Sequence, residues 1–469
     1  EHGANYADIF FQVQDDGGTA NTGVDTDPVA NVFRFHVTSV NDEPLGTDNT
    51  VTTLEDTPFT FTAANFGFTD PQDDNPANNL LNVIIDTLPV SGTLTLAAGA
   101  SAPGPVVAGQ VISAADLSYL VFTPVANEHG TGYADFTFRV QDDGGTANGG
   151  IDTDQIANTM TVDVISVNDA PLGADNSATI LEDFDYVFNV ADFGFTDPSD
   201  SPANNFVNVI IDTLPADGTL FLAAGASAAG PVTAGQVISV ADIPFLTFSP
   251  VANEHGANYA DFTFRVQDDG GTLFGGADTD PVANTFTFHV TSVNDEPLGA
   301  DNTVTTLEDT EFVFSAADFG FTDPQDDNPA NNLANVIIDT IPTDGTLYLD
   351  VGSSAPGVVT AGQVISAADL AFLTFSPAAN EHGTGYADFT FRVQDDGGTA
   401  NGGIDTDQIA NTMTINVTSV NDAPAGTDNT VSTLEDTDYI FSVADFGFTD
   451  PNDNPDNNFQ NVIITTLPV

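Results

Sequence analysis

The acidic loop at residues 140–154 contains residue types that could do chemistry. It reads VQDDGGTANGGIDTD, and it holds four aspartates and four glycines but no basic residue. Carboxylates on flexible loops are the ligands that hard cations prefer. A turn built from Asp and Gly, with no ligand, is the alternative interpretation. Close variants of the loop begin at Val13, Val266 and Val393.

The overall charge makes a bound cation the stronger interpretation. The chain has 69 acidic residues, four arginines and no lysine, for a formal net charge of -65. It should repel nucleic acid and anionic membranes, so neither is an expected partner. A halophilic surface would scatter its acids and use glutamate freely. Glutamate occurs only 11 times here, and aspartate fills the clustered loops.

Several kinds of protein are excluded by what the sequence lacks. It contains no cysteine for disulfides and no lysine for isopeptide cross-links. No apolar run approaches the ~18 residues of a membrane span, so membrane insertion is not expected. There is no recognisable signal peptide, and the opening phrase EHGANYAD matches the interior of later repeats. We therefore expect the chain to be part of something longer.

Internal repetition is the strongest feature of the sequence. The triplet EHG starts at residues 1, 128, 254 and 381. The VND landmarks predict three complete repeats: unit 1 (42–168), unit 2 (169–294) and unit 3 (295–421). Residues 1–41 are predicted to be the C-terminal part of a repeat, and 422–469 the N-terminal part of another. The phrases NDEP and NDAP alternate, which indicates duplication of a two-unit block.

Each unit is predicted to be all-β. Seven segments of unit 1 are rich in β-branched and aromatic residues and are separated by Gly, Pro, Asn and Asp. This pattern favours a linear array of seven-stranded, immunoglobulin-like β-sandwiches with phenylalanine cores. Residues 112–117, ISAADL, are predicted to form one helical turn. The predicted strands read TVTTL, FTFTA, NVIID, GTLTL, YLVFTP, YADFTFRV and TMTVDVISV.

The ordered phrases VNDAP, LEDT, TDPxD, GTL, VTAGQxI and FTPxANEHGxGYADFTFxVQDDGG resemble the tandem cadherin-like repeats of large bacterial surface and secreted proteins. The resemblance covers essentially the whole chain. It implies an extracellular, non-catalytic, calcium-binding rod of the kind found in adhesins and biofilm proteins.

An up-and-down path through seven strands brings distant acids to each junction between units. The LED turn, the NEHG loop and the linker of one unit should meet the TDPSD and QDDGG loops of the next. Because these ligands are oxygens on flexible loops, Ca2+ is a better candidate than Mg2+, which demands a tighter octahedron.

The resemblance also implies ligand positions. Glu55, Glu182, Glu308 and Glu435 resemble the cadherin glutamate near the first strand, and the Asn-Asp pairs at 41–42, 168–169, 294–295 and 421–422 resemble its linker. Ser166 stands where that linker has aspartate, so we expect one or two ions per junction rather than three. Asp152 and Asp154 could instead hold an ion within their own loop. The predicted calcium ligands are Glu55, Asp56, Glu128, Asp142, Asp143, Asp152, Asp154, Asn168, Asp169, Glu182, Asp197, Asp200, Glu254, Asp268, Asp269, Asn294, Asp295, Glu308, Asp323, Asp326, Asn421 and Asp422.

Two functions remain open at this point. The chain could be a calcium-stiffened stalk that carries an adhesive tip elsewhere, or a self-assembling filament or surface-layer subunit whose copies contact one another. The sequence contains no motif typical of a Ser-His-Asp catalytic triad, a phosphate-binding loop or a set of zinc ligands, so an enzyme is not expected. The EHG histidines are expected to be structural or exposed to solvent, and the arginines to pair with nearby carboxylates. Leu273 and Phe274 form an apolar pair in a loop that is expected to be exposed to solvent. Phe274 is therefore predicted to contact another chain or a neighbouring unit.

Overall fold

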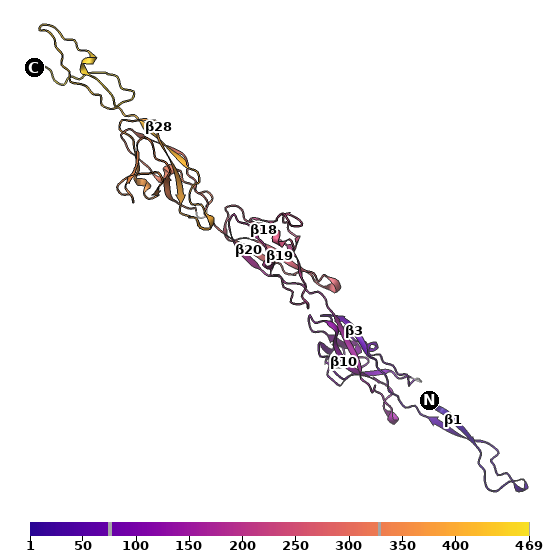
Figure 1. Cartoon of the computed structure of the whole chain (residues 1–469). Helices are drawn as coiled ribbons and strands as arrows, with labels where there is room; N and C mark the ends of the chain where they lie inside the picture. Colours follow the sequence, from indigo (N-terminus) through magenta and orange to yellow (C-terminus); the bar gives the residue numbers. More distant parts are fainter. Residues whose placement is uncertain (74–76, 327–329, 469) are drawn as a thin grey trace.

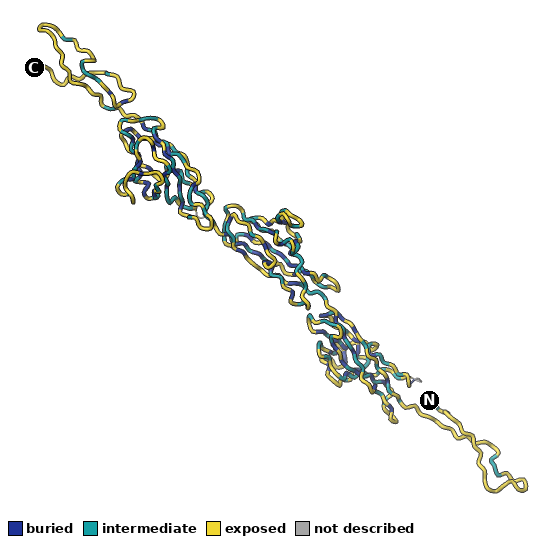
Figure 2. The backbone as a smooth tube through the Cα atoms, in the orientation of Figure 1, coloured by how far each residue is buried: buried dark blue, intermediate teal, exposed yellow. Residues whose placement is uncertain are grey.

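The chain is a thin, elongated string of β-sandwiches (Figure 1). This computed structural model describes residues 1–73, 77–326 and 330–468. Three sandwich bodies follow one another along the string and contain nearly all of the buried residues (Figure 2). The predicted all-β architecture is confirmed. Within the described residues, no helix is both long enough and apolar enough to cross a membrane.

Unit 1 has two facing sheets. The five-stranded sheet has the order β3-β11-β10-β5-β8, and the four-stranded sheet has the order β4-β9-β6-β7. Short 3-10 turns interrupt the connections at η2 (Ala63–Phe66), η3 (Leu117–Tyr119) and η4 (Ala147–Gly149). The strands are β3 (Asn49–Leu54), β4 (Phe59–Thr60), β5 (Leu80–Ile85), β6 (Thr93–Leu96), β7 (Gly104–Pro105), β8 (Gln110–Ser113), β9 (Leu120–Thr123), β10 (Gly130–Asp142) and β11 (Asn158–Ile165).

Units 2 and 3 repeat these two sheets strand for strand. The strands of unit 2 are β12 (Asn176–Leu181), β13 (Tyr186–Val187), β14 (Phe206–Ile211), β15 (Thr219–Leu222), β16 (Gly230–Pro231), β17 (Gln236–Ser239), β18 (Leu246–Ser249), β19 (Gly256–Asp268) and β20 (Asn284–Thr291). Those of unit 3 are β21 (Asn302–Leu307), β22 (Phe312–Val313), β23 (Leu333–Ile338), β24 (Thr346–Leu349), β25 (Gly357–Val358), β26 (Gln363–Ser366), β27 (Leu373–Ser376), β28 (Gly383–Asp395) and β29 (Asn411–Thr418). Their 3-10 turns are η5 (Val190–Phe193), η6 (Ile243–Phe245), η7 (Leu273–Gly275), η8 (Ala316–Phe319), η9 (Leu370–Phe372) and η10 (Ala400–Gly402).

The first and last long strands of each unit pair in parallel. In unit 1, β3 runs beside β11 from Asn49 opposite Met160 to Leu54 opposite Ile165. The other strand pairs of the unit are antiparallel. The chain therefore enters a unit along one edge of the five-stranded sheet and leaves along the neighbouring strand.

The seven predicted segments all contain strand, but the described residues of unit 1 form nine strands. The two additions are β7, which has only two residues, and the edge strand β8. Residues 112–117 were predicted to form a helical turn, and this was wrong for Ile112 and Ser113, which belong to β8. Residues 110–113 pair with β5 in a regular antiparallel register, so pairing with a neighbouring strand decides their conformation. The 3-10 turn begins later, at Leu117.

The cores are built from phenylalanine, as predicted. The largest fully buried side chains are all Phe. Along β10, Ala134, Phe136, Phe138 and Val140 point into the sandwich, and the residues between them are less buried. The alternation continues to the last residue of the strand, so Asp142 is also directed inward and is only 1% exposed. Strand periodicity thus buries the first aspartate of the QDD phrase in units 1, 2 and 3, namely Asp142, Asp268 and Asp395.

The terminal segments contain parts of the same unit. Strands β1 (Gly3–Phe11) and β2 (Asn31–Val37) pair as β10 and β11 do, with a comparable register shift after the opening glycine. A 3-10 turn, η1 (Ala20–Thr22), lies between them. Residues 422–468 include η11 (Val443–Phe446), which corresponds to η2. The unit boundaries themselves stay a prediction, and the three core clusters lie inside them.

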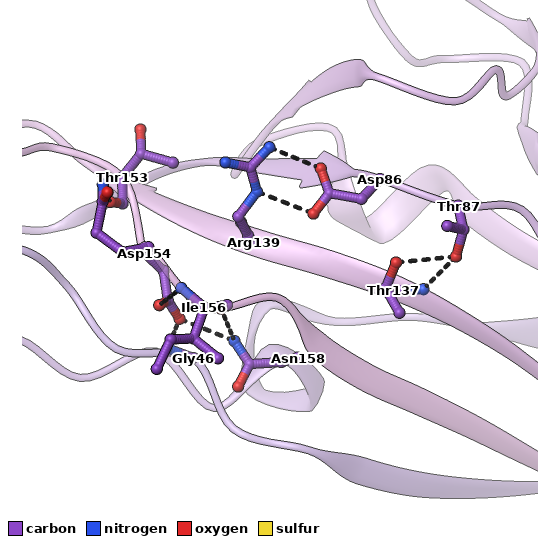
Figure 3. A network of polar contacts seen from close by, with 10 residues as sticks. Gly46, Asp86, Thr87, Thr137, Arg139, Thr153, Asp154, Ile156 and Asn158 are labelled. Carbon is purple, nitrogen blue, oxygen red and sulfur yellow. Dashed lines mark hydrogen bonds and ion pairs between the residues drawn. The ribbon is translucent and has the colours of Figure 1, made fainter.

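Charged side chains also brace unit 1 (Figure 3). Arg139 donates from Nε and a terminal nitrogen to the two oxygens of Asp86, at 2.8 and 2.9 Å. Asp154 is 3% exposed and accepts hydrogen bonds from Gly46 N, Ile156 N and Asn158 Nδ2. Asp154 therefore fastens the loop after β10 to the segment that enters the unit.

Replacing Asp154 by alanine should destabilise unit 1 by roughly 2–4 kcal/mol, because three donors lose a buried, charged acceptor. Asp152→Ala is the matched control, since Asp152 is half-buried and its side chain accepts only from the hydroxyl of Thr153. Thermal unfolding followed by circular dichroism would measure both. Equal shifts in the two variants would contradict the assigned role of Asp154.

Candidate metal centre

Each junction is built from two loops of one unit, the linker, and two loops of the next unit. On the exit side, Asp56 of the LED turn accepts a hydrogen bond from Asn127 N of the NEHG loop at 3.2 Å. On the entry side, the linker residue Asn168 donates to Asp268 and to Ala277 O of the QDDGG loop. The loops therefore meet in the order that the strand path predicted.

A group of three carboxylates joins units 2 and 3, and we name it the bridging cluster. It consists of Glu182, Asp295 and Asp326, and one oxygen of each lies within 4.8 Å of the others. Glu182 comes from unit 2, Asp295 from the linker and Asp326 from the TDPQDD loop of unit 3. Glu182 is 2% exposed and Asp326 is 5% exposed. Three acids from three separate segments are thus held together away from solvent.

Backbone hydrogen bonds fix the bridging cluster in place. Glu182 Oε1 accepts from Val293 N in the linker, and Asp326 Oδ2 accepts from Asp295 N at 2.7 Å. Glu182 and Asp326 therefore each use one oxygen to hold the linker, and the second oxygen of Glu182 lies 3.2 Å from His255 Nδ1. In unit 1, Ser166 Oγ donates to Glu55 Oε1 at 3.4 Å, so the serine just before the linker contacts the glutamate.

A second group of acids lies deeper in unit 3, and we name it the inner cluster. It contains Asp323, Asp326 and Asp395, whose charges act on one another. Asp395 is the inward-pointing residue at the end of β28 and is 3% exposed. The linker residue Asn294 covers it and donates to both of its oxygens at 3.2 Å. Asp326 is shared by the two clusters.

Many oxygens in these clusters have no protein donor. Across the described ranges 1–73, 77–326 and 330–468, the buried side-chain oxygens without a hydrogen-bond partner all lie in junction segments. Buried polar atoms are normally satisfied, so this concentration points to a ligand that is a cation. The atoms are Glu43 Oε2, both Oδ of Asp70, Asp142 Oδ2, Asp169 Oδ2, Asp197 Oδ1, Asp295 Oδ2, both Oδ of Asp323, Asp422 Oδ2 and Asp450 Oδ1.

The other junctions gather equivalent residues. At the entry to unit 1, Asp42 N donates to Asp73 at 2.6 Å, and the charge of Asp70 acts on Asp142. Between units 1 and 2, the carboxylates that act on one another are Glu55, Asp56, Asp169, Asp197, Asp200 and Asp268. After unit 3 they are Glu308, Asp309, Asp422, Asp450 and Asp453. Asn457 donates to the linker residue Asn421 at 2.7 Å.

The clustered acids resist ionisation. Burial, reinforced by the neighbouring charges of Asp326 and Asp183, raises the pKa of Asp295 to about 6. Burial and the charges of Asp326 and Asp395 likewise raise the pKa of Asp323 to about 6. At neutral pH these groups are nevertheless mostly charged, and they repel one another unless a cation lies between them.

Among the described residues, no lysine or arginine side chain lies in the clusters to neutralise them. The chain has no lysine. As predicted, each arginine forms a two-point ion pair with an aspartate of a strand or strand end: Arg34 with Asp8, Arg139 with Asp86, Arg265 with Asp212, and Arg392 with Asp339. The oxygen-only donor set fits Ca2+, which accepts six to eight oxygens in flexible geometry.

Several predicted ligands lie apart from the clusters or have both oxygens occupied. Glu128 and Glu254 are exposed and accept from the hydroxyls of Tyr133 and Tyr259, at 2.7 and 2.8 Å. The second aspartate of each QDD phrase is also exposed. In units 1 and 2 both of its oxygens accept from one asparagine, which is Asn79 for Asp143 and Asn205 for Asp269. Asp154 is occupied by the three donors described above, and Asp152 accepts from Thr153.

The structure also adds residues that sequence analysis missed. His255 Nδ1 lies 3.2 Å from Glu182 Oε2, and His382 Nδ1 lies 3.1 Å from Glu308 Oε2. His382 Nε2 is also 2.8 Å from Asn454 O, which belongs to the next repeat. These histidines were expected to be structural or exposed to solvent, and they in fact contact the junction glutamates. Asp183, Asp395 and Asn331 join the same junctions, and their signal was the recurrence of LED, QDD and PANN in every unit.

Solved structures with a similar chain path include cadherin ectodomain repeats. Mouse cadherin-23 EC22-24 has 16% identity and a TM-score of 0.38, with 81% of this chain and 100% of that chain covered. For Drosophila N-cadherin EC1-4 the identity is 13%, the TM-score 0.25, and the coverage 88% and 83%. At these scores the likeness carries no conclusion about function. No family model and no curated protein matches the sequence.

The calcium-free protein should lose stability as the pH rises from about 4 to about 6. The pKa of Asp295 and of Asp323 is about 6 in the folded chain, whereas a free aspartate titrates near 3.9. The folded state therefore binds more protons than the unfolded state across this window, and raising the pH favours unfolding.

Scanning calorimetry in a chelator at constant ionic strength would measure this slope. In the double variant Asp295→Asn, Asp323→Asn, stability should fall less steeply with rising pH, because two of the responsible groups no longer titrate. A slope equal to that of the parent protein would count against the electrostatic account of the clusters.

Asp295→Ala should weaken calcium binding at one junction by at least about tenfold, because a linker ligand that joins two units is lost. Asp344→Ala is the matched control, since Asp344 lies in an exposed turn of the same unit. Calorimetric titration with Ca2+ gives the affinity and the number of sites for both variants. The same loss in both would mean that Asp295 is not a ligand.

Proposed function

We propose that this chain is a non-catalytic, calcium-binding extracellular rod that serves as a stalk or fibre in cell adhesion or biofilm. The observation that carries the proposal is the gathering of buried carboxylate oxygens without protein donors at the junctions between units. A cation at such a junction has a mechanical effect, because it ties two units through ligands from both.

Coulomb's law gives the size of the repulsion that a bound cation would remove. Two like charges 4.8 Å apart repel by roughly 3–4 kcal/mol at an effective dielectric constant of 20. Each junction contains several such pairs, and no lysine or arginine of the described residues offsets them. A bound Ca2+ converts this repulsion into attraction, so the metal should stiffen the linker rather than build the sandwiches, whose cores are apolar.

The two clusters suggest two ions per junction. The bridging cluster would hold one through Glu182, Asp295 and Asp326. The inner cluster would hold the other through Asp323, Asp326 and Asp395. This number agrees with the one or two ions expected from the sequence. The DTD residues Asp152 and Asp154 are not needed for either ion.

Location outside the cell follows from the chemistry of the sites. Extracellular modules bind calcium with dissociation constants of about 10⁻⁴ to 10⁻³ M, which suits sites that work where calcium is abundant. The sequence resemblance to bacterial surface proteins extends this to an adhesin or biofilm context.

Self-assembly into a filament is the second candidate, and one repeated feature favours it. The edge strands β8, β17 and β26 each expose a central valine, Val111, Val237 and Val364, every one 55% exposed. Unprotected strand edges can pair with another copy. Electron microscopy in calcium would separate the candidates: isolated thin strands support the stalk, and laterally bundled fibres support the filament.

Removing calcium should make the rod flexible and reduce its maximum dimension. Small-angle scattering on residues 1–469 in millimolar Ca2+ and then in chelator, at constant ionic strength, would measure the change. Circular dichroism on the same samples should show that the sandwiches remain folded. An unchanged maximum dimension and an unchanged flexibility after chelation would refute the proposal.

A further inference from the structure

An exposed apolar pair lies at the tip of the loop between β19 and β20. Leu273 is 77% exposed and Phe274 is 66% exposed. The matching positions hold Ala20-Asn21, Ala147-Asn148 and Ala400-Asn401. The N-terminal segment shares the EHGANYAD phrase of unit 2 but lacks the pair. Leu273-Phe274 is therefore peculiar to unit 2 and does not mark one of the two alternating unit types.

The backbone of this tip is unfavourable for an aromatic residue. Phe274 has φ 58°, and the matching Asn21, Asn148 and Asn401 have φ 56°, 57° and 57°. Asparagine tolerates this left-handed conformation, whereas a bulky side chain is strained in it. Local structure favours Asn here, so the presence of Phe274 calls for another explanation. Strained residues cluster where a ligand or partner binds.

The pair forms one wall of a groove between units 1 and 2. The groove has a volume of about 330 Å³ and is lined by Leu273 and Phe274 together with His129 and Ser166 of unit 1 and Asp200 of unit 2. The matching groove between units 2 and 3 is about 200 Å³ and has Ala400 and Asn401 in place of the apolar pair. Phe274 therefore lies beside the preceding unit, and the apolar wall distinguishes one junction from the next.

The chemistry of the groove is both apolar and anionic. A purely apolar side chain entering it would displace water from the carboxylate of Asp200 without replacing the lost hydrogen bonds. An arginine or lysine side chain would suit both the apolar pair and the negative charge around it. Its aliphatic stem can lie along Leu273, its cation can face the ring of Phe274, and the charge is attracted to a chain of net charge -65.

We propose that this groove binds a basic segment, led by an arginine or lysine side chain, of a partner protein with a different sequence. A second copy of the chain is a poor occupant because it has no lysine, and its four arginines are held in two-point ion pairs with aspartates. Two rods of this charge also repel each other. The partner is therefore recognised by charge complementarity.

The probe is a glycine-rich peptide with four arginines, and its control has citrulline, a neutral isostere, at the same positions. Residues 1–469 are titrated in saturating Ca2+ at about 0.15 M salt, where the Debye length is about 8 Å and diffuse attraction is screened. The arginine peptide should bind at one saturable site per chain, and the citrulline peptide at least about tenfold more weakly, a difference of about 1.4 kcal/mol.

The decisive variants exchange residues between matching loops. Leu273→Ala with Phe274→Asn installs the pair found at 400–401 and should weaken the arginine peptide about tenfold without loss of thermal stability. Ala400→Leu with Asn401→Phe should create a second site. Val351→Thr, at a side chain that is 92% exposed elsewhere, is the control and should change nothing.

Each remaining outcome overturns the proposal. Equal affinity of the arginine peptide for the parent and the 273–274 variant would place the binding elsewhere on the acidic surface. Equal affinity of the two peptides would remove the cation from the recognition. If the parent self-associates in sedimentation without peptide and the 273–274 variant does not, the occupant is a second copy of the chain. The calcium dependence of the rod's flexibility can persist in any of these cases.

Discussion

Repulsion between carboxylates that are withdrawn from water is the interaction on which this structure depends. Asp295 and Asp323 are pushed toward their neutral forms by burial and by their neighbours. The same loops also hold the linker through backbone hydrogen bonds, such as the one from Asp295 N to Asp326. The linker is therefore attached to the very groups that repel one another. The sandwiches, in contrast, are built around apolar phenylalanine cores, so the repulsion is concentrated at the junctions between units.

Much of this arrangement follows from the sequence. The repeats, the all-β units and the convergence of LED, linker, TDP and QDD loops at each junction could all be predicted from recurring phrases and strand patterns. The difference between Asp142 and Asp143 could also have been predicted. Phe136, Phe138 and Val140 point inward along β10, so the residue two positions after Val140 must point inward as well. Its neighbour Asp143 points outward and binds Asn79 instead.

Other features depend on contacts between distant segments and could not be predicted. Glu128 and His129 are neighbours in sequence, and only the folded loop decides that Glu128 accepts from Tyr133 while its neighbour faces the junction. In unit 3 the corresponding histidine, His382, reaches both Glu308 and the next repeat. The strand β8 escaped prediction for a similar reason, because a four-residue edge strand is defined by its pairing with β5.

The parallel pairing of β3 with β11 determines how the rod would carry tension. The chain enters unit 1 at the Asn49 end of β3 and leaves at the Ile165 end of β11, and the two strands run side by side between these points. A pull on the two ends of the unit would slide the strands along each other, so the hydrogen bonds between them would share the load. Strands peeled apart from one end would break their bonds one after another at lower force. A string of such units is therefore suited to resist stretching along its length.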